Sequence, residues 1–135
     1  MSDYGISVKL GISYEQTLAA VTEALKAEGF GILTEIDVRS TLKKKLDVDF
    51  GKYTILGACN PQFAYKALQA EREIGLLLPC NVIVYEDGDG SVVSAIAPIA
   101  AMGMVDNPEL ESIARQVDVK LRRVIASLED KKGSL

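Results

Sequence analysis

The sequence predicts an α+β fold, a two-layer sandwich in which helices pack on one face of a mixed, mostly antiparallel sheet. Apolar residues alternate with polar ones in several short segments, as in half-buried strands, and recur every three or four residues in others, as in helices. Asp87–Gly90 between two strand-like segments is typical of a hairpin turn. No glycine-rich phosphate loop follows a predicted strand, so a nucleotide-binding doubly wound fold is not favoured.

The chain begins with the pattern of a strand, a helix and a second strand. Ser13 and Gln16 have the spacing of a capping box at the start of a helix, and Gly29 is the type of residue that ends one. The segment after Gly29 is rich in β-branched residues. The predicted elements are a strand over 6–10, a helix over about 13–28 and a strand over 30–38.

The middle of the chain predicts a short helix, a strand and another helix. Leu42 and Leu46 flank Lys43–Lys45, which indicates an amphipathic helix with a basic outer face. Asn60 and Pro61 are typical of an N-cap and a first helical position. The predicted elements are a helix over 40–46, a strand over 53–59 and a helix over about 61–70.

The last part of the chain predicts a hairpin and a long helix. Leu76–Pro79 is expected to be extended, since the residue before proline avoids the helical region. Pro98–Val105 is expected to be an apolar loop, and Asn107-Pro108 to begin the last helix. The predicted strands are 80–86 and 91–96. The last helix carries an apolar stripe of Leu110, Ile113, Ala114, Val117, Leu121, Val124, Ile125 and Leu128, and with the first helix it should cover the sheet.

Composition excludes several functional classes. The 135 residues suit one domain, 1–135, with a frayed tail at about 130–135. The chain has no histidine, which excludes Ser-His and Cys-His catalysis and His-ligated zinc. Its net charge of −4 argues against a nucleic-acid partner. No signal peptide and no apolar run of about 20 residues is present, so we expect no membrane partner and a cytoplasmic location.

Two Cys-Asn pairs are the strongest candidates for a ligand site. Cys59-Asn60 and Cys80-Asn81 each stand where an apolar run meets a new element. The predicted helix after Cys59 would favour its thiolate and lower its pKa. If the two strands are antiparallel neighbours, the end of one and the start of the other share an edge, and we expect the two sulfurs in one pocket. The alternative is that both cysteines are packed as small hydrophobic residues.

Two methionines extend the candidate site. Thioethers of Met102 and Met104 together with the thiols would form a soft donor set that selects Cu(I) or, less well, zinc. Alternatively these methionines fill gaps in an apolar loop. Asn60 and Asn81 are candidates for hydrogen bonds to a ligand or for capping backbone groups. Lys43–Lys45 is either an anion-binding surface or a solvated helix face.

The chain resembles the bacterial and archaeal family called domain of unknown function 302 (DUF302). The two cysteine motifs make the resemblance specific. It extends through Gly29-Phe30-Gly31, Thr34-Glu35-Ile36-Asp37, 44–49, Tyr53, Ile55-Leu56-Gly57-Ala58-Cys59-Asn60-Pro61, Ala64, Ala67-Leu68, Gly75-Leu76-Leu77-Leu78-Pro79-Cys80-Asn81-Val82, Tyr85-Glu86 and 102–105. The resemblance implies a compact α+β fold similar to the TATA-binding-protein-like and helix-grip arrangements, often dimeric, and no established activity.

Three functions follow as hypotheses. The first is a module that binds a small molecule or a soft metal ion in a pocket with Cys59 and Cys80. The second is a dimeric structural or interaction protein in which the cysteines are only packed. The third is a small thiol redox enzyme in which one cysteine attacks and the other resolves. A homodimer is expected because the apolar segment Ala95–Val105 exceeds what one copy is expected to bury, and the resemblance points the same way.

Overall fold

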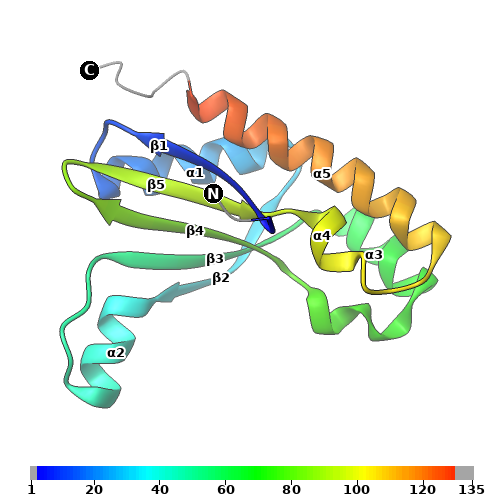
Figure 1. Cartoon of the computed structure of the whole chain (residues 1–135), viewed down its shortest axis with the longest axis horizontal. Coiled ribbons are helices and arrows are strands. Elements are labelled where there is room, and N and C mark those ends of the chain that lie inside the picture. The colour runs from blue at the N-terminus through cyan, green and yellow to red at the C-terminus, as the bar shows by residue number, and fades with distance from the viewer. Residues whose placement is uncertain (1–2, 130–135) are drawn as a thin grey trace.

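The computed structural model describes residues 3–129 and contains one antiparallel sheet of five strands in the order β1-β5-β4-β3-β2 (Figure 1). The strands are β1 (Gly5–Leu10), β2 (Gly31–Asp37), β3 (Tyr53–Cys59), β4 (Cys80–Asp87) and β5 (Gly90–Ile96). The helices are α1 (Tyr14–Ala27), α2 (Val38–Leu46), α3 (Pro61–Ala70), the 3-10 helix η1 (Arg72–Leu77), α4 (Pro98–Met102) and α5 (Pro108–Glu129). The predicted α+β class is confirmed, with every strand pair antiparallel. The predicted frayed tail lies outside the described residues.

The hairpin between β4 and β5 forms at the predicted turn. Asp87 pairs with Gly90, and Gly88 has a φ of +59°, a conformation that favours glycine. Gly90 also passes against β1, where an added Cβ would overlap the carbonyl oxygen of Leu10. Glycine is therefore required twice in this turn, once for its φ and once for the close approach of two strands.

Both ends of α1 are set by local sequence. The Ser13 side chain accepts from the Gln16 backbone N–H at 3.1 Å, and the Gln16 side chain accepts from the Ser13 N–H at 3.2 Å. At the other end, the Phe30 N–H donates to the Leu25 carbonyl, and Gly29 takes a φ of +87°. The predicted capping box and glycine stop are both present, and they turn the chain directly into β2.

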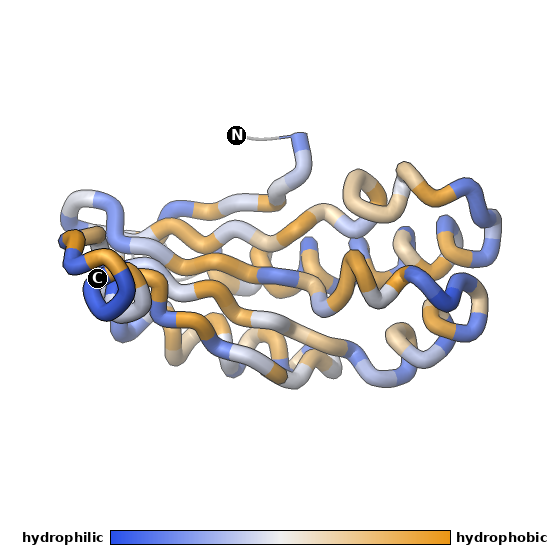
Figure 2. Tube along the Cα trace, turned by 90° about the horizontal axis from the view of Figure 1, so that it is seen from below, coloured by the Kyte–Doolittle hydropathy of each residue, from blue (hydrophilic) through white to orange (hydrophobic). Residues whose placement is uncertain are grey.

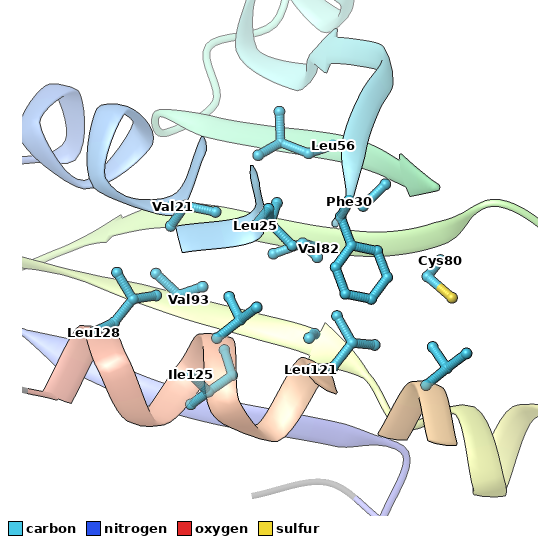
Figure 3. Packing of buried hydrophobic residues seen from close by; sticks show 14 of the residues in the cluster. Val21, Leu25, Phe30, Leu56, Cys80, Val82, Val93, Leu121, Ile125 and Leu128 are labelled. Atoms are coloured by element: carbon cyan, nitrogen blue, oxygen red, sulfur yellow. The ribbon is translucent and has the colours of Figure 1, made fainter. Parts of the chain in front are cut away.

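The core lies between the sheet and the two long helices. All eight apolar residues of the predicted α5 stripe are buried, and α5 lies beside α1 on one face of the sheet. Figure 3 shows Leu121, Ile125 and Leu128 of α5 directed towards Val93 of β5 and Val82 of β4. The buried apolar residues form one cluster that includes Cys80. The opposite face of the sheet carries a stacked pair, Tyr53 and Tyr85, with ring centroids 5.4 Å apart.

Two segments differ from the sequence-based expectation. Leu76 and Leu77 belong to η1 rather than to an extended run, and only Leu78 has extended backbone. The expected apolar loop contains α4, which begins at Pro98 and buries Pro98 and Met102. Proline at the first turn favours a helix start, and contact with α5 supplies the burial that a short helix needs.

Helix α2 projects away from the sheet and the other helices, at the edge formed by β2 and β3 (Figure 1). None of its residues is buried. Figure 2 views the molecule from the side towards which α2 projects, and hydrophobic and hydrophilic positions alternate along the strands. Within residues 3–129, no helix is both long and apolar enough to span a membrane.

Candidate functional site

An apolar cavity of about 190 Å³ lies at the edge of the sheet where β3 ends and β4 begins. Its walls come from these two strand ends, from α3, from the start of β2 and the residue before it, from the two residues before β4 and from single residues of α4 and α5. Its lining residues are Phe30, Leu33, Ala58, Cys59, Asn60, Phe63, Ala64, Ala67, Leu78, Pro79, Cys80, Met102 and Val117. The only side chains among them with nitrogen, oxygen or thiol groups are Asn60 and the two cysteines.

The antiparallel pairing of β3 with β4 brings the two cysteines to this cavity. Ala58 is paired with Cys80, so Cys59 stands one position beyond the last pair of the ladder. Both cysteine side chains are free thiols, and both residues line the cavity. The arrangement follows the expected geometry, in which the end of one strand and the start of its antiparallel neighbour share an edge.

The two thiols have different surroundings. Cys80 is buried and Cys59 is half-buried. Burial raises the pKa of the Cys80 thiol from its usual 9.0 to about 11, and the charge of a nearby Cys59 thiolate adds to the effect. Cys80 is therefore protonated at neutral pH, and in that form it is a poor nucleophile. Figure 3 shows the Cys80 side chain near the Phe30 ring, within the hydrophobic layer.

The two asparagines are separated by the structure. Asn60 lines the cavity, and its Nδ2 donates to the Glu28 carbonyl at 3.4 Å. It occupies the N-cap position of α3, but its side chain makes no capping hydrogen bond there. Asn81 lies on the opposite face of the sheet, near Tyr53 and Ile83. Asn81 does not line the cavity, and its side chain points to the face opposite that of Cys80 because successive strand residues alternate.

The two methionines also line different hollows. Met102 is buried in α4 and lines the cavity with both cysteines. Met104, which is 76% exposed, lines a different groove beside η1. Within residues 3–129, no three acidic or cysteine side chains are grouped so that they could hold a metal ion. The sulfur-containing residues that line the cavity are thus Cys59, Cys80 and Met102, without Met104.

The aromatic walls of the cavity were not identified as site residues from the sequence. Phe30 follows the glycine that ends α1, and Phe63 lies in the first turn of α3. Val117 belongs to the α5 stripe, whose other members fill the core. Residues that line a cavity between elements carry the same apolar periodicity as residues that fill the core, so the sequence signal does not separate them.

This chain is similar to a known protein family and to a solved structure. The family model described as "Domain of unknown function DUF302" matches residues 6–128. The crystal structure of an uncharacterized conserved DUF302 protein from Bacillus stearothermophilus is similar to this chain, with a TM-score of 0.84 and 30% sequence identity. The similarity covers 97% of this chain and 100% of that chain. No curated protein matches the sequence.

Proposed function

The chain belongs to the DUF302 family, and from this premise we propose that it is a binding module that holds a small apolar ligand in the cavity beside Cys59 and Cys80. The observation that carries the proposal is the cavity itself, about 190 Å³ with an almost wholly apolar lining. An apolar protein cavity of about 150 Å³ accommodates benzene, so this one suits a ligand of one ring or a short branched chain.

The chemistry of the lining favours binding over catalysis. The chain has no histidine, and the two thiols are the only acid–base groups at the cavity. A general acid or base works best with a pKa near the operating pH, whereas the pKa of the Cys80 thiol is about 11. Asn60 supplies one amide, of which one Nδ2–H donates to the Glu28 carbonyl, and this leaves the other N–H as a donor and Oδ1 as an acceptor to orient a ligand.

Thermal unfolding with small apolar probes tests the proposal. Benzene and toluene should raise the melting temperature in a saturable manner, since a ligand that binds only the folded state stabilises it. Ala64→Leu places a larger side chain in the cavity wall and should abolish the shift. Ala126→Leu makes the same change on the exposed side of α5 and should keep the shift. If no probe raises the melting temperature of the unmodified chain, the apolar-ligand proposal is wrong.

A soft metal ion is the second candidate, supported by the three sulfur residues at one cavity. Thiolates and a thioether favour Cu(I), and zinc less well. Binding would displace the proton from Cys80, so affinity should rise with pH. Anaerobic titration with Cu(I) against a competing chelator should then give one equivalent. Met102→Leu should weaken the site and Met104→Leu should leave it unchanged; equal effects of both variants, or no binding, would contradict this candidate.

A further inference from the structure

The segment formed by α2 and the residues after it, 38–50, exposes apolar side chains beside unpaired basic ones; we call this segment the arm. Leu46, Val48 and Phe50 are all exposed. Among the described residues, Lys43 pairs with Asp47 at 2.9 Å, while Lys44 and Lys45 form no ion pair. The arm thus offers an apolar surface together with three cations that form no ion pair with a described residue, Arg39, Lys44 and Lys45, in a chain whose net charge is −4.

A groove at the other end of the molecule has the complementary character. It lies between η1 and residues 104–106, with a volume of about 400 Å³. Its lining residues are Glu71, Glu73, Ile74, Leu76, Leu77, Met104, Val105 and Asp106. Leu76 and Met104 are the two most exposed large apolar residues of the described chain, at 82% and 76%. The three carboxylates form no ion pair with any described residue.

We propose that the arm of one copy docks in this groove of a second copy of the chain. The apolar side chains of the arm would cover Leu76 and Met104, and Lys44 and Lys45 would approach the carboxylates of the groove. Large exposed apolar side chains with a polar rim mark interaction sites, and opposite charges select the partner and its orientation. This interface does not depend on the cavity beside Cys59 and Cys80.

The positions of the two surfaces allow both docking contacts to form at once. In Figure 1, α2 projects below the left end of the sheet, and the segment between α3 and β4 that contains η1 lies below the right end. In a two-fold symmetric dimer, each arm would dock in the groove of the other copy. Such an interface is closed, which predicts a dimer rather than a filament.

The structure changes which surface is expected to form a dimer interface. The sequence pointed to Ala95–Val105 as an apolar surface needing a partner. In the structure, Pro98 and Met102 of that segment are buried within the chain, and Met104 and Val105 contribute to the groove. The unpartnered apolar surface therefore shifts to the arm and to the groove.

Sedimentation velocity on the full chain at micromolar concentration tests the proposal. The unmodified chain should sediment as a dimer, and the dimer should weaken as salt is raised from about 0.1 M to about 1 M, which shortens the screening length from about 10 Å to about 3 Å. Reversing two of the arm's cations (Lys44→Glu, Lys45→Glu) should raise the dimer Kd by roughly tenfold or more. Reversing two groove carboxylates (Glu71→Lys, Glu73→Lys) should do the same, and combining all four changes should restore the dimer.

A matched control reverses two lysines elsewhere (Lys9→Glu, Lys26→Glu), which makes the same change in net charge and should leave the dimer intact. Leu46→Ser should weaken the dimer without unfolding the chain, because Leu46 is exposed; circular dichroism checks the fold. A chain that is monomeric at all concentrations overturns the proposal. So does a dimer that survives both the arm reversal and Leu46→Ser.

Discussion

At Gly57 of β3, the absence of a Cβ lets Thr34 of β2 and Pro79, just before β4, pack closely against the strand. An added Cβ would overlap Oγ1 of Thr34 on β2 and lie 2.8 Å from Cγ of Pro79. Both neighbours are anchored, Thr34 by the β2–β3 ladder and Pro79 by its ring and by the start of β4. A methyl group at this position therefore requires the side chain of Thr34, the ring of Pro79 or the backbone of Gly57 to shift.

We predict that Gly57→Ala destabilises the fold by about 1–3 kcal/mol, the usual cost of overpacking. Thr34→Ala in the same chain removes the overlapping hydroxyl and should recover part of the loss. Gly75→Ala is the matched control, since an added Cβ there meets nothing within 4 Å and should have little effect. Urea unfolding measures all four chains. Equal stabilities for the Gly57 and Gly75 variants would show that the contact is relieved without cost.

The Cys80 thiol predicts a specific loss of stability in alkali. Its pKa rises from 9.0 to about 11 on folding, so between these pH values the folded chain holds a proton that the unfolded chain has lost. The resulting stability is present below pH 9 and is lost as the pH rises through 11. Two pKa units correspond to about 2–3 kcal/mol.

Urea unfolding from about pH 8 to about pH 11 checks this expectation. Cys80→Ala lacks the titrating group, so its stability should fall less steeply with pH than that of the unmodified chain. Burial also raises the pKa of Tyr53, which adds to the dependence of stability on pH. Because Tyr53 is present in both chains, its contribution cancels when their stability curves are compared. Parallel stability curves for the two chains would contradict the burial-raised pKa.

At the scale of elements, local sequence signals predicted most of the fold. Ser13, Gln16 and Gly29 act within a few residues of themselves, and the α1 boundaries follow from them. The α5 stripe was predictable because burial repeats along the whole helix. The exceptions depend on tertiary contacts: α4 forms where Pro98 and Met102 meet α5. Asn60 has the sequence of an N-cap, yet its amide bonds to Glu28, which is distant in sequence.

The candidate site was predictable to a similar degree. The expectation that Cys59 and Cys80 share an edge required only antiparallel strands, which the predicted hairpin favoured. Asn81 was paired with them by sequence adjacency, although the two-residue period of a strand places it on the other face. Met104 was grouped with Met102 for the same reason, and the end of α4 separates them. Adjacency in the sequence therefore predicted which side chains share the cavity less well than the two-residue alternation of a strand does.

The packing of α5 gives a prediction at this scale. Leu121 is fully buried at the centre of the stripe, whereas Val119 on the same helix is 50% exposed. Leu121→Ala should destabilise the chain by about 2–5 kcal/mol through lost burial and the cavity left behind. Val119→Ala is the matched control and should change stability by less than about 1 kcal/mol. Thermal or urea unfolding distinguishes them, and similar losses for both would mean that α5 does not pack as described.

At the scale of the whole molecule, burial is distributed unevenly across the sheet. Strand β4 has a neighbour on each side, and Val82 and Val84 are fully buried under α1 and α5. Strand β2 is at the edge, with a bulge between Ile32 and Thr34, and none of its residues is buried. The helix that follows it, α2, also has none. The β2–α2 segment is therefore joined to the core mainly by the β2–β3 ladder.

This asymmetry predicts two levels of opening, since regions with few buried contacts open locally at a lower free energy than the core. Native-state hydrogen exchange at concentrations low enough to avoid self-association should show amides of 31–46 exchanging through local opening. Amides of 80–96 should exchange only through global unfolding, so added urea should accelerate them with the slope of complete unfolding.

Two variants separate these levels. Val84→Ala lowers global stability and should strongly accelerate exchange of the 80–96 amides. Ile36→Ala on the exposed edge should accelerate exchange of the 31–46 amides alone. If both groups exchange with the same free energy and the same urea dependence, then the β2–α2 segment is as firmly held as the centre of the sheet, and the prediction of two levels of opening is wrong.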